Sequence, residues 1–236
     1  MNKKSGCFLI RDIRENLVVI TWEELAGQTV QLSEKIRNLA PVLISAYTKT
    51  EVEFARKHPE CVAQDFMLKS LAPLVSDISA INWAIFEEKT KKILAQFFET
   101  TDWAGFSNVR DRHIFVTATD KKTGKILGVI QFIISPEFAK NNVKAALSGV
   151  VSHAQDRGIE KILMSSIFKI YPNVERIFLD TRSTNQAGIN EYANWGFTQF
   201  ACEMLHWTNL EYVVACAKSK TTETLQQVAE RLITQG

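Results

Sequence analysis

Residues 150–163 read VVSHAQDRGIEKIL, an apolar stretch that passes through a polar loop directly into a helical pattern. The apolar residues before Ser152 predict a buried strand, and Ile162 and Leu163 begin the apolar face of a helix. Gly158 lies between them and lets the backbone approach a ligand. Helix N-termini offer unpaired N–H groups and partial positive charge, so the junction predicts an anion site, for phosphate above all. Since α/β proteins contain many such junctions, this segment alone does not identify the ligand.

A strand–turn–strand pattern precedes this segment. His113–Thr119 alternates between two faces, Asp120–Lys125 is a polar turn with a late glycine, and Ile126–Ile134 is a second apolar run. Together they predict a β-hairpin. Val143–Val151 predicts a third strand that leads into the loop.

The pattern after the loop alternates between strand and helix. Arg176–Asp180 predicts a short strand, and Gln186–Asn194 a helix that ends at Gly196, where a C-terminal glycine belongs. The remaining expected elements are strands near Thr198–Trp207 and Tyr212–Ala217 and a final helix over Thr222–Thr234. This order is typical of a mixed α/β domain.

The second informative segment is residues 185–197, NQAGINEYANWGF, which follow a strand. Taken with the loop, this segment resembles the GNAT superfamily of N-acetyltransferases. It is similar to that family's N-x-x-A-x-x-x-Y-x-x-x-G-F helix, with Asn185, Tyr192 and Gly196 at the matching positions. The order of elements from 113 to 217 is also the family's order, so the resemblance covers about half of the chain.

The loop itself is similar to the family's Q/R-x-x-G-x-G/A pyrophosphate loop through Gln155, Gly158 and Glu160. Two positions depart from the family pattern. Gly188 replaces the usual alanine, and Glu160 replaces a glycine or alanine. A carboxylate beside a pyrophosphate is repulsive, whereas a Glu in a first helical turn favours the helix dipole. We therefore expect Glu160 either to weaken cofactor binding or to point outward and leave its backbone amide available.

The resemblance implies an α/β fold with a GNAT-like mixed, mostly antiparallel central sheet flanked by helices, and an enlarged helical N-terminal region. We expect residues 1–104 to form one or two strands plus a helical extension packed on the core. Residues 105–236 are then the acyl-CoA-binding core with a C-terminal helix. Within the extension, the expected helices cover Asn82–Glu99 and, with weaker patterns, Gln28–Ala40, Glu51–Lys57 and the stretch around Val62–Leu71.

The resemblance also implies acetyl-CoA as cosubstrate, with its pyrophosphate held by the loop backbone. From its place beside the helix N-terminus, we expect Arg157 to add a charge-assisted contact. The strand that ends at Val151 would splay from Ile177–Thr181, so that the pantetheine arm pairs with exposed backbone groups. A backbone N–H there would polarise the thioester carbonyl. The implied cofactor-binding residues are Val151, Gln155, Asp156, Arg157, Gly158, Ile159, Glu160, Lys161 and Asn185.

Two residues are candidates for catalysis. The resemblance implies that Tyr192 protonates the leaving CoA thiolate, against the alternative of a packed aromatic side chain. Asp180, at the end of a strand on the acceptor side, is a candidate base for the amine. The pattern favours a structural role for Asp180 over this one, either a bond to loop N–H groups or a pair with Arg182. Glu137 and His153 are weaker candidates for the base.

Composition narrows the class of partner. The 28 Lys+Arg and 26 Asp+Glu give a net charge of +2, which is far from the strongly basic balance of a nucleic-acid binder. No stretch approaches the roughly 18 apolar residues of a membrane span. We expect acetyl-CoA and an amine-bearing substrate as partners, without nucleic acid or membrane. A cytoplasmic location and a possible homodimer complete these expectations.

The four cysteines are far apart in the sequence and form no CxxC pair. They also show no cluster with histidine, and His58, His113 and His206 have no partner spacing, so the sequence predicts no metal site. The cysteines are Cys7, Cys61, Cys202 and Cys216.

The sequence therefore predicts an acetyl-CoA-dependent N-acetyltransferase in which an amine attacks the thioester directly within a ternary complex. The alternative is a catalytically weak or inactive GNAT-fold module that binds CoA or regulates another protein. Glu160 and the lack of an obvious base favour this alternative. The acceptor, whether a small amine, a peptide N-terminus or a lysine, is left open.

Overall fold

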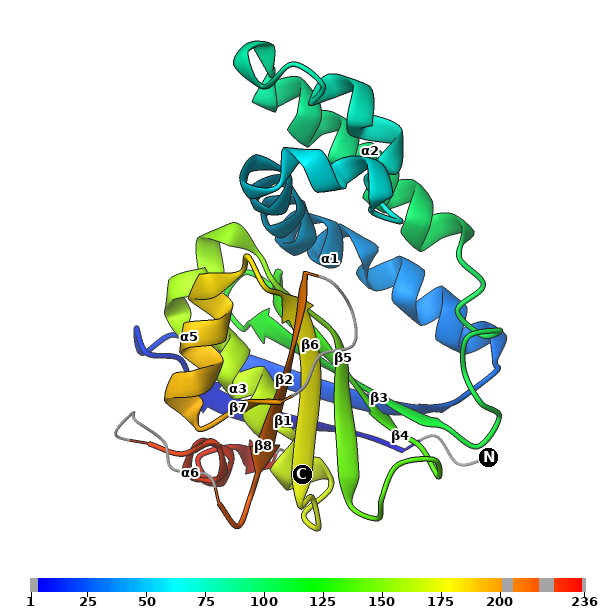
Figure 1. The fold of residues 1–236 in the computed structure, drawn as a ribbon. Helices are drawn as coiled ribbons and strands as arrows, with labels where there is room; N and C mark the ends of the chain where they lie inside the picture. The colour runs from blue at the N-terminus through cyan, green and yellow to red at the C-terminus, as the bar shows by residue number, and fades with distance from the viewer. Residues whose placement is uncertain (1–3, 201–205, 217–222, 235–236) are drawn as a thin grey trace.

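A computed structural model describes residues 4–200, 206–216 and 223–234 of the chain. Within these ranges, one nine-stranded sheet runs through the molecule in the order β7-β8-β6-β5-β4-β3-β2-β1-β9 (Figure 1). The strands are β1 Ser5–Arg11, β2 Leu17–Ala26, β3 Arg112–Asp120, β4 Ile126–Ile134, β5 Asn142–Val150, β6 Arg176–Arg182, β7 Thr198–Phe200, β8 Trp207–Val213 and β9 Ile233–Thr234. All neighbouring strands are antiparallel except β5 and β6, which are parallel. The expected mixed, mostly antiparallel sheet is confirmed.

Helices cover both faces of this sheet (Figure 1). The α-helices are α1 Val30–Lys57, α2 Trp83–Thr100, α3 Ile159–Ser165, α4 Ile167–Ile170, α5 Gln186–Trp195 and α6 Leu225–Glu230. Four short 3-10 helices are η1 Pro59–Gln64, η2 Lys69–Leu74, η3 Ile78–Ala80 and η4 Ser152–Arg157. No helix in the described part of the chain is both long and apolar enough to cross a bilayer.

Alternation along β3 divides the core into two layers. Ile114, Val116 and Ala118 pack in the cluster shared with α3, α5 and α6, whereas Phe115 packs in the cluster shared with α1 and α2. This is the alternation that the sequence of the hairpin predicts, and the β3–β4 hairpin is confirmed. The face of the sheet that carries α3 and α5 is called the α5 face below, and the opposite one the α1 face.

The helical extension differs from expectation in two places. Residues 30–57 form one helix of 28 residues with Pro41 inside it, not two separate helices. Its apolar side chains at Leu39 and Leu43 pack on the sheet on either side of the proline, and this packing outweighs the loss of one backbone hydrogen bond. The stretch around 62–71 is 3-10 helix rather than α-helix.

The C-terminal segment also differs from expectation. The predicted helix over 222–234 is limited to α6, because the chain then extends and β9 pairs with β1 through Leu9 and Ile233. The predicted strand near 198–207 is seen as β7 and the first residue of β8, and the strand near 212–217 begins earlier, at Trp207. Residues 201–205 and 217–222, which include Cys202, lie outside the described residues.

Candidate active site

A gap opens between β5 and β6 in the middle of the sheet. The two parallel strands pair only where Asn142–Lys144 lies beside Arg176–Phe178. Beyond these positions β5 continues along β4 as far as Val150, while β6 pairs with β8 instead. The backbone edge of β5 that faces β6 is therefore left without a ladder partner, as the resemblance predicts.

A β-bulge shapes the strand at this gap. Ile130 of β4 pairs with Ser148, but Phe132 pairs with Ala145, so three residues of β5 span the length of two in β4. The Ser148 N–H donates a hydrogen bond to the Tyr47 hydroxyl oxygen, 3.3 Å away, instead of joining a ladder with β6. An amide donor is thus directed to the centre of the gap.

Tyr47 reaches this position because α1 lies directly on β5. A side chain at Gly149 would place its Cβ 2.9 Å from the Ala46 Cβ and 3.6 Å from the Leu43 Cα, so only glycine permits this close approach. Burial raises the pKa of Tyr47, which keeps its phenol neutral. No local sequence pattern indicates Tyr47, since its contact with Ser148 depends on the crossing of α1 over β5.

Tyr192 and Glu160 form a hydrogen-bonded pair on the α5 face of the gap. The Tyr192 hydroxyl donates to Glu160 Oε1 at 2.5 Å, and Tyr192 is 6% exposed. Burial raises the pKa of Glu160, and burial together with the Glu160 charge raises the pKa of Tyr192 well above its ordinary value. The Ser148 side chain, also within hydrogen-bonding reach of Tyr192, acts in the opposite direction.

This orientation of Glu160 corrects the expectation that its side chain points outward, whereas its effect on cofactor binding stays a prediction. The carboxyl group neither points into solvent nor lies free beside the loop, because it accepts the phenolic hydrogen of Tyr192. The sequence pattern places Glu160 in the first turn of α3 and Tyr192 near the end of α5, but it does not show that the two helices face each other.

Charged side chains line the α1 face of the gap. Asp180 of β6 pairs with Lys144 of β5, with 2.9 Å between Nζ and Oδ1. The expected structural alternative, pairing of Asp180 with Arg182, is wrong. Arg182 is buried and bound to Glu51 and Asp65, at 2.7 and 2.8 Å.

The loop before α3 has the predicted strand–loop–helix form. η4 ends at Arg157 and is followed by Gly158, whose φ of 69° favours glycine, and α3 begins at Ile159. Gln155 and Asp156 are exposed at the loop surface, where they contact Lys49 and Arg14.

The Arg157 side chain does not take part in this loop surface. It is 8% exposed, and its guanidinium binds Asp12 Oδ2 at 2.5 Å and Asp120 Oδ2 at 3.2 Å. The expected phosphate contact from this side chain is therefore revised, since two carboxylates already engage it. Only the backbone of Arg157 remains for a cofactor.

The other expected cofactor residues have structural partners. The Asn185 side chain caps α5 by accepting from the Gly188 N–H at 3.2 Å, and it donates to Thr181 Oγ1 at 3.1 Å. Val151 N donates to Leu127 O at 2.9 Å, so this residue continues the link to β4.

Two further residues of the loop and helix are turned toward other parts of the structure. The Lys161 ammonium donates to the Glu223 carbonyl at 2.6 Å, and Ile159 is fully buried. The candidate base His153 is exposed, and Glu137 contacts Asn108 at 3.1 Å.

The hollows identified on the surface lie away from the gap. One of about 470 Å³ lies on the α1 face of β1–β3, lined among others by Cys7, Thr21 and Phe115. A second of about 440 Å³ lies beside the two neighbouring turns that contain Asn16 and Lys122. Both are kept below as competing positions for a ligand.

Residues 76–197, just over half of the chain, match the family model described as Acetyltransferase (GNAT) family. The chain belongs to the GNAT acetyltransferase family. The matched segment contains β3 to β6, the loop before α3, and α5, and it therefore includes the whole gap. A comparison with curated proteins found no match.

Solved structures that are similar to this GNAT chain include the following three. PaiA N-acetyltransferase from Thermoplasma acidophilum, in complex with coenzyme A, is 14% identical, with 82% of this chain and 98% of that one covered and a TM-score of 0.46. IAA acetyltransferase from Bacillus cereus is 14% identical, with 52% and 84% covered and a TM-score of 0.37. Ard1 from Thermoplasma volcanium is 18% identical, with 42% and 70% covered and a TM-score of 0.36. Because these sequence identities and TM-scores are low, the family assignment rests on the match of residues 76–197 to the family model.

Proposed function

We propose that this GNAT protein is an acetyl-CoA-dependent N-acetyltransferase in which an amine attacks the thioester directly within a ternary complex. The observation that carries the proposal is the gap between β5 and β6, where pairing stops after three positions and an amide donor at Ser148 faces the opening. An extended cofactor arm with amide groups of its own can pair with such an edge.

The two faces of the gap suit different reactants. On the α5 face, the loop at 151–158 and the Tyr192–Glu160 pair lie beside the gap, so we assign this side to the CoA moiety. On the α1 face, the partly exposed carboxylate of Asp180, now paired with Lys144, can bind a protonated amine in place of the lysine. The two reactants then meet at Ser148.

Three groups have assigned roles in the transfer. The Ser148 N–H, released from the Tyr47 hydroxyl, stabilises the oxygen of the thioester carbonyl as negative charge develops on it. Tyr192 gives its proton to the CoA thiolate. Because burial raises the pKa of Glu160, its carboxyl group tends to hold a proton of its own, which it then gives to the Tyr192 phenolate to restore the phenol. Asp180, on the acceptor side, accepts the proton of the amine after leaving Lys144.

The hydrogen bond between Tyr192 and Glu160 favours one alternative function. It already engages the proposed acid, and the carboxyl group occupies space beside the expected route of the cofactor. A GNAT-fold module that binds CoA weakly, or that regulates without turnover, is consistent with this contact. A cytoplasmic location and a homodimer remain predictions from the sequence.

Calorimetric titration of acetyl-CoA, combined with free-thiol release over a panel of small amines, peptide N-termini and lysine peptides, tests the proposal. We expect saturable binding and thiol release that depends on one class of amine. Binding without amine-dependent release across the panel would support the regulatory alternative, and absence of binding would contradict both functions.

A further inference from the structure

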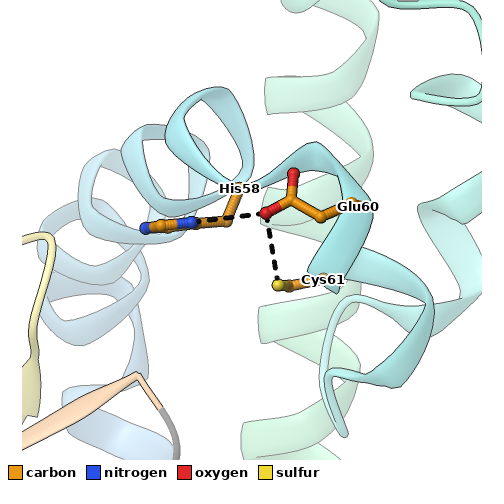
Figure 2. A group of neighbouring side chains, drawn as sticks. All are labelled: His58, Glu60 and Cys61. Atoms are coloured by element: carbon orange, nitrogen blue, oxygen red, sulfur yellow. Dashed lines mark hydrogen bonds and ion pairs between the residues drawn. The ribbon is translucent and has the colours of Figure 1, made fainter.

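A cluster of potential metal ligands lies at the end of α1, outside the gap. His58 is the C-terminal cap of α1, and Glu60 and Cys61 follow it in η1 (Figure 2). Glu60 Oε1 lies 3.5 Å from His58 Nδ1 and 3.5 Å from Cys61 Sγ, and the three ligand atoms are all within 4.8 Å of one another. A nitrogen, an oxygen and a sulfur atom, each a possible metal ligand, thus lie close together.

The distances fit a tetrahedral zinc ion. Zinc–ligand bonds of about 2.0 Å to nitrogen or oxygen and about 2.3 Å to sulfur place neighbouring ligand atoms about 3.3–3.6 Å apart. Both contacts of Glu60 have this length, and the ligand atoms of His58 and Cys61 lie within 4.8 Å of each other, so the site needs at most a small shift of one side chain. The ligand types also favour zinc over magnesium or calcium, which prefer oxygen alone.

The backbone holds this cluster in place without a metal. The His58 N–H donates to the Phe54 carbonyl at 2.9 Å, and the Cys61 N–H donates to the His58 carbonyl at 3.0 Å. The His58 ring packs against Phe54, with ring centroids 5.8 Å apart. A preorganised turn of this kind lowers the entropy cost of binding an ion.

A second imidazole lies next to the cluster. The ring of His206, which precedes β8, is 4.9 Å from the His58 ring between centroids. Its Nε2 is buried and has no hydrogen-bond partner among the described residues. A buried nitrogen without a partner is costly, and coordination to a metal would satisfy it.

We propose that His58, Glu60 and Cys61 form a zinc-binding site, with His206 turning to supply the fourth ligand. On binding, the Cys61 thiol releases its proton to solvent and the thiolate binds the ion. The site would fasten the end of α1 and η1 to the start of β8. The proposed site is independent of the acetyl-transfer proposal. It differs from the expectation of no metal site, because the fold brings His58 and Cys61 together with Glu60.

Cobalt and zinc titrations of the full-length protein after chelation test this site. Cobalt bound by a thiolate gives a charge-transfer absorption band, and competition with a chromophoric chelator measures zinc stoichiometry and affinity. The variants are Cys61→Ser, Glu60→Gln and His206→Gln, with Cys216→Ser as the matched control because Cys216 is an exposed free thiol elsewhere. Glu60 is solvent-exposed, so Glu60→Gln keeps the fold intact.

We expect one zinc per wild-type chain and a cobalt–thiolate band that disappears in Cys61→Ser and persists in Cys216→Ser. Glu60→Gln and His206→Gln should each weaken zinc binding by about 10-fold or more, because each substitution removes one proposed zinc ligand. The proposal is overturned if the wild type binds no stoichiometric zinc, or if Glu60→Gln and Cys61→Ser bind it as tightly as Cys216→Ser.

Discussion

At the scale of single residues, the proposed chemistry of the gap depends on the Tyr192 phenol and the Glu160 carboxyl group, which share a hydrogen bond. Both are enclosed on the α5 face, and burial raises the pKa of each. Together they hold a proton beside the position where a thiolate would leave. Asn185 and Gly196 position this pair, because they cap the two ends of α5.

We predict that Tyr192→Phe lowers turnover by about 100-fold, in the range of a lost general acid, while acetyl-CoA affinity changes little. Tyr212→Phe is the matched control. Tyr212 is also buried and donates one hydrogen bond, to Gln226 Oε1 at 2.5 Å, but it lies away from the gap. Steady-state kinetics on a slow amine, for which chemistry limits the rate, measures the difference. Equal effects of the two substitutions would show that Tyr192 is only a packed aromatic residue.

The buried side chain of His113 should make the free energy of unfolding depend on pH. It is 3% exposed, bound to Ser107 Oγ at 2.6 Å and Gln131 Nε2 at 2.9 Å, and burial lowers its pKa to about 4. The unfolded chain, with a histidine pKa of about 6.5, takes up a proton first as the pH falls. The contribution of His113 to the free energy of unfolding is therefore fully present above about pH 6.5. It is lost as the pH falls toward 4, a decrease of roughly 3 kcal/mol.

Denaturant unfolding at pH 4 to 7 measures this effect. We expect His113→Gln to flatten the pH dependence of the unfolding free energy by up to about 1.4 kcal/mol per pH unit. His153→Gln, at an exposed histidine, should leave it unchanged. If His113→Gln keeps the wild-type slope, then the proton uptake comes from other groups.

At the scale of elements, packing between α1 and the sheet decides which residues reach the gap. Gly149 permits the contact of α1 with β5, and this contact places Tyr47 at the Ser148 N–H. Arg182 of β6 fastens the other half of the helix through Glu51, and it also binds Asp65 beyond η1. The extension is thus joined to the central sheet by a buried ionic cluster.

We predict that Arg182→Gln lowers the free energy of unfolding by about 3–5 kcal/mol, because it leaves two carboxylates buried without their cation. Arg176→Gln on the same strand is the control. Its ion pair with Glu211 is partly exposed, so we expect a change of about 0–1 kcal/mol. Urea unfolding of both variants measures the difference, and similar losses would contradict a special role for the buried cluster.

The elements with local signals were predictable from the sequence. The β3–β4 hairpin follows its alternation, and α2 begins at the cap Asn82, whose side chain accepts from the Ile85 N–H. Two contacts were not predictable from the sequence: that of α1 with β5 and that of Glu160 with Tyr192. The first joins residues over 100 positions apart and the second residues over 30 positions apart, and no local pattern links such residues. Likewise, the helix through Pro41 is continuous because of tertiary packing.

At the scale of the whole molecule, one interrupted strand pairing opens the sheet between the two faces that we assign to the two reactants. The sheet is continuous from β7 to β9, yet β5 and β6 diverge in its interior, with α1 on one side and α3 and α5 on the other (Figure 1). The central claim is that acetyl-CoA occupies this opening. The two surface hollows, at β1–β3 and at the turns near Asn16, are the competing positions.

Hydrogen–deuterium exchange with and without CoA, read out by mass spectrometry of peptides, locates the cofactor most directly. We predict that CoA slows exchange in peptides that cover residues 145–161, which include the unpaired edge of β5 and the loop before α3. Peptides that cover residues 5–7 and 21–23, at the larger hollow, should be unaffected. Slowed exchange at that hollow, with unchanged exchange at 145–161 under saturating CoA, would contradict the account.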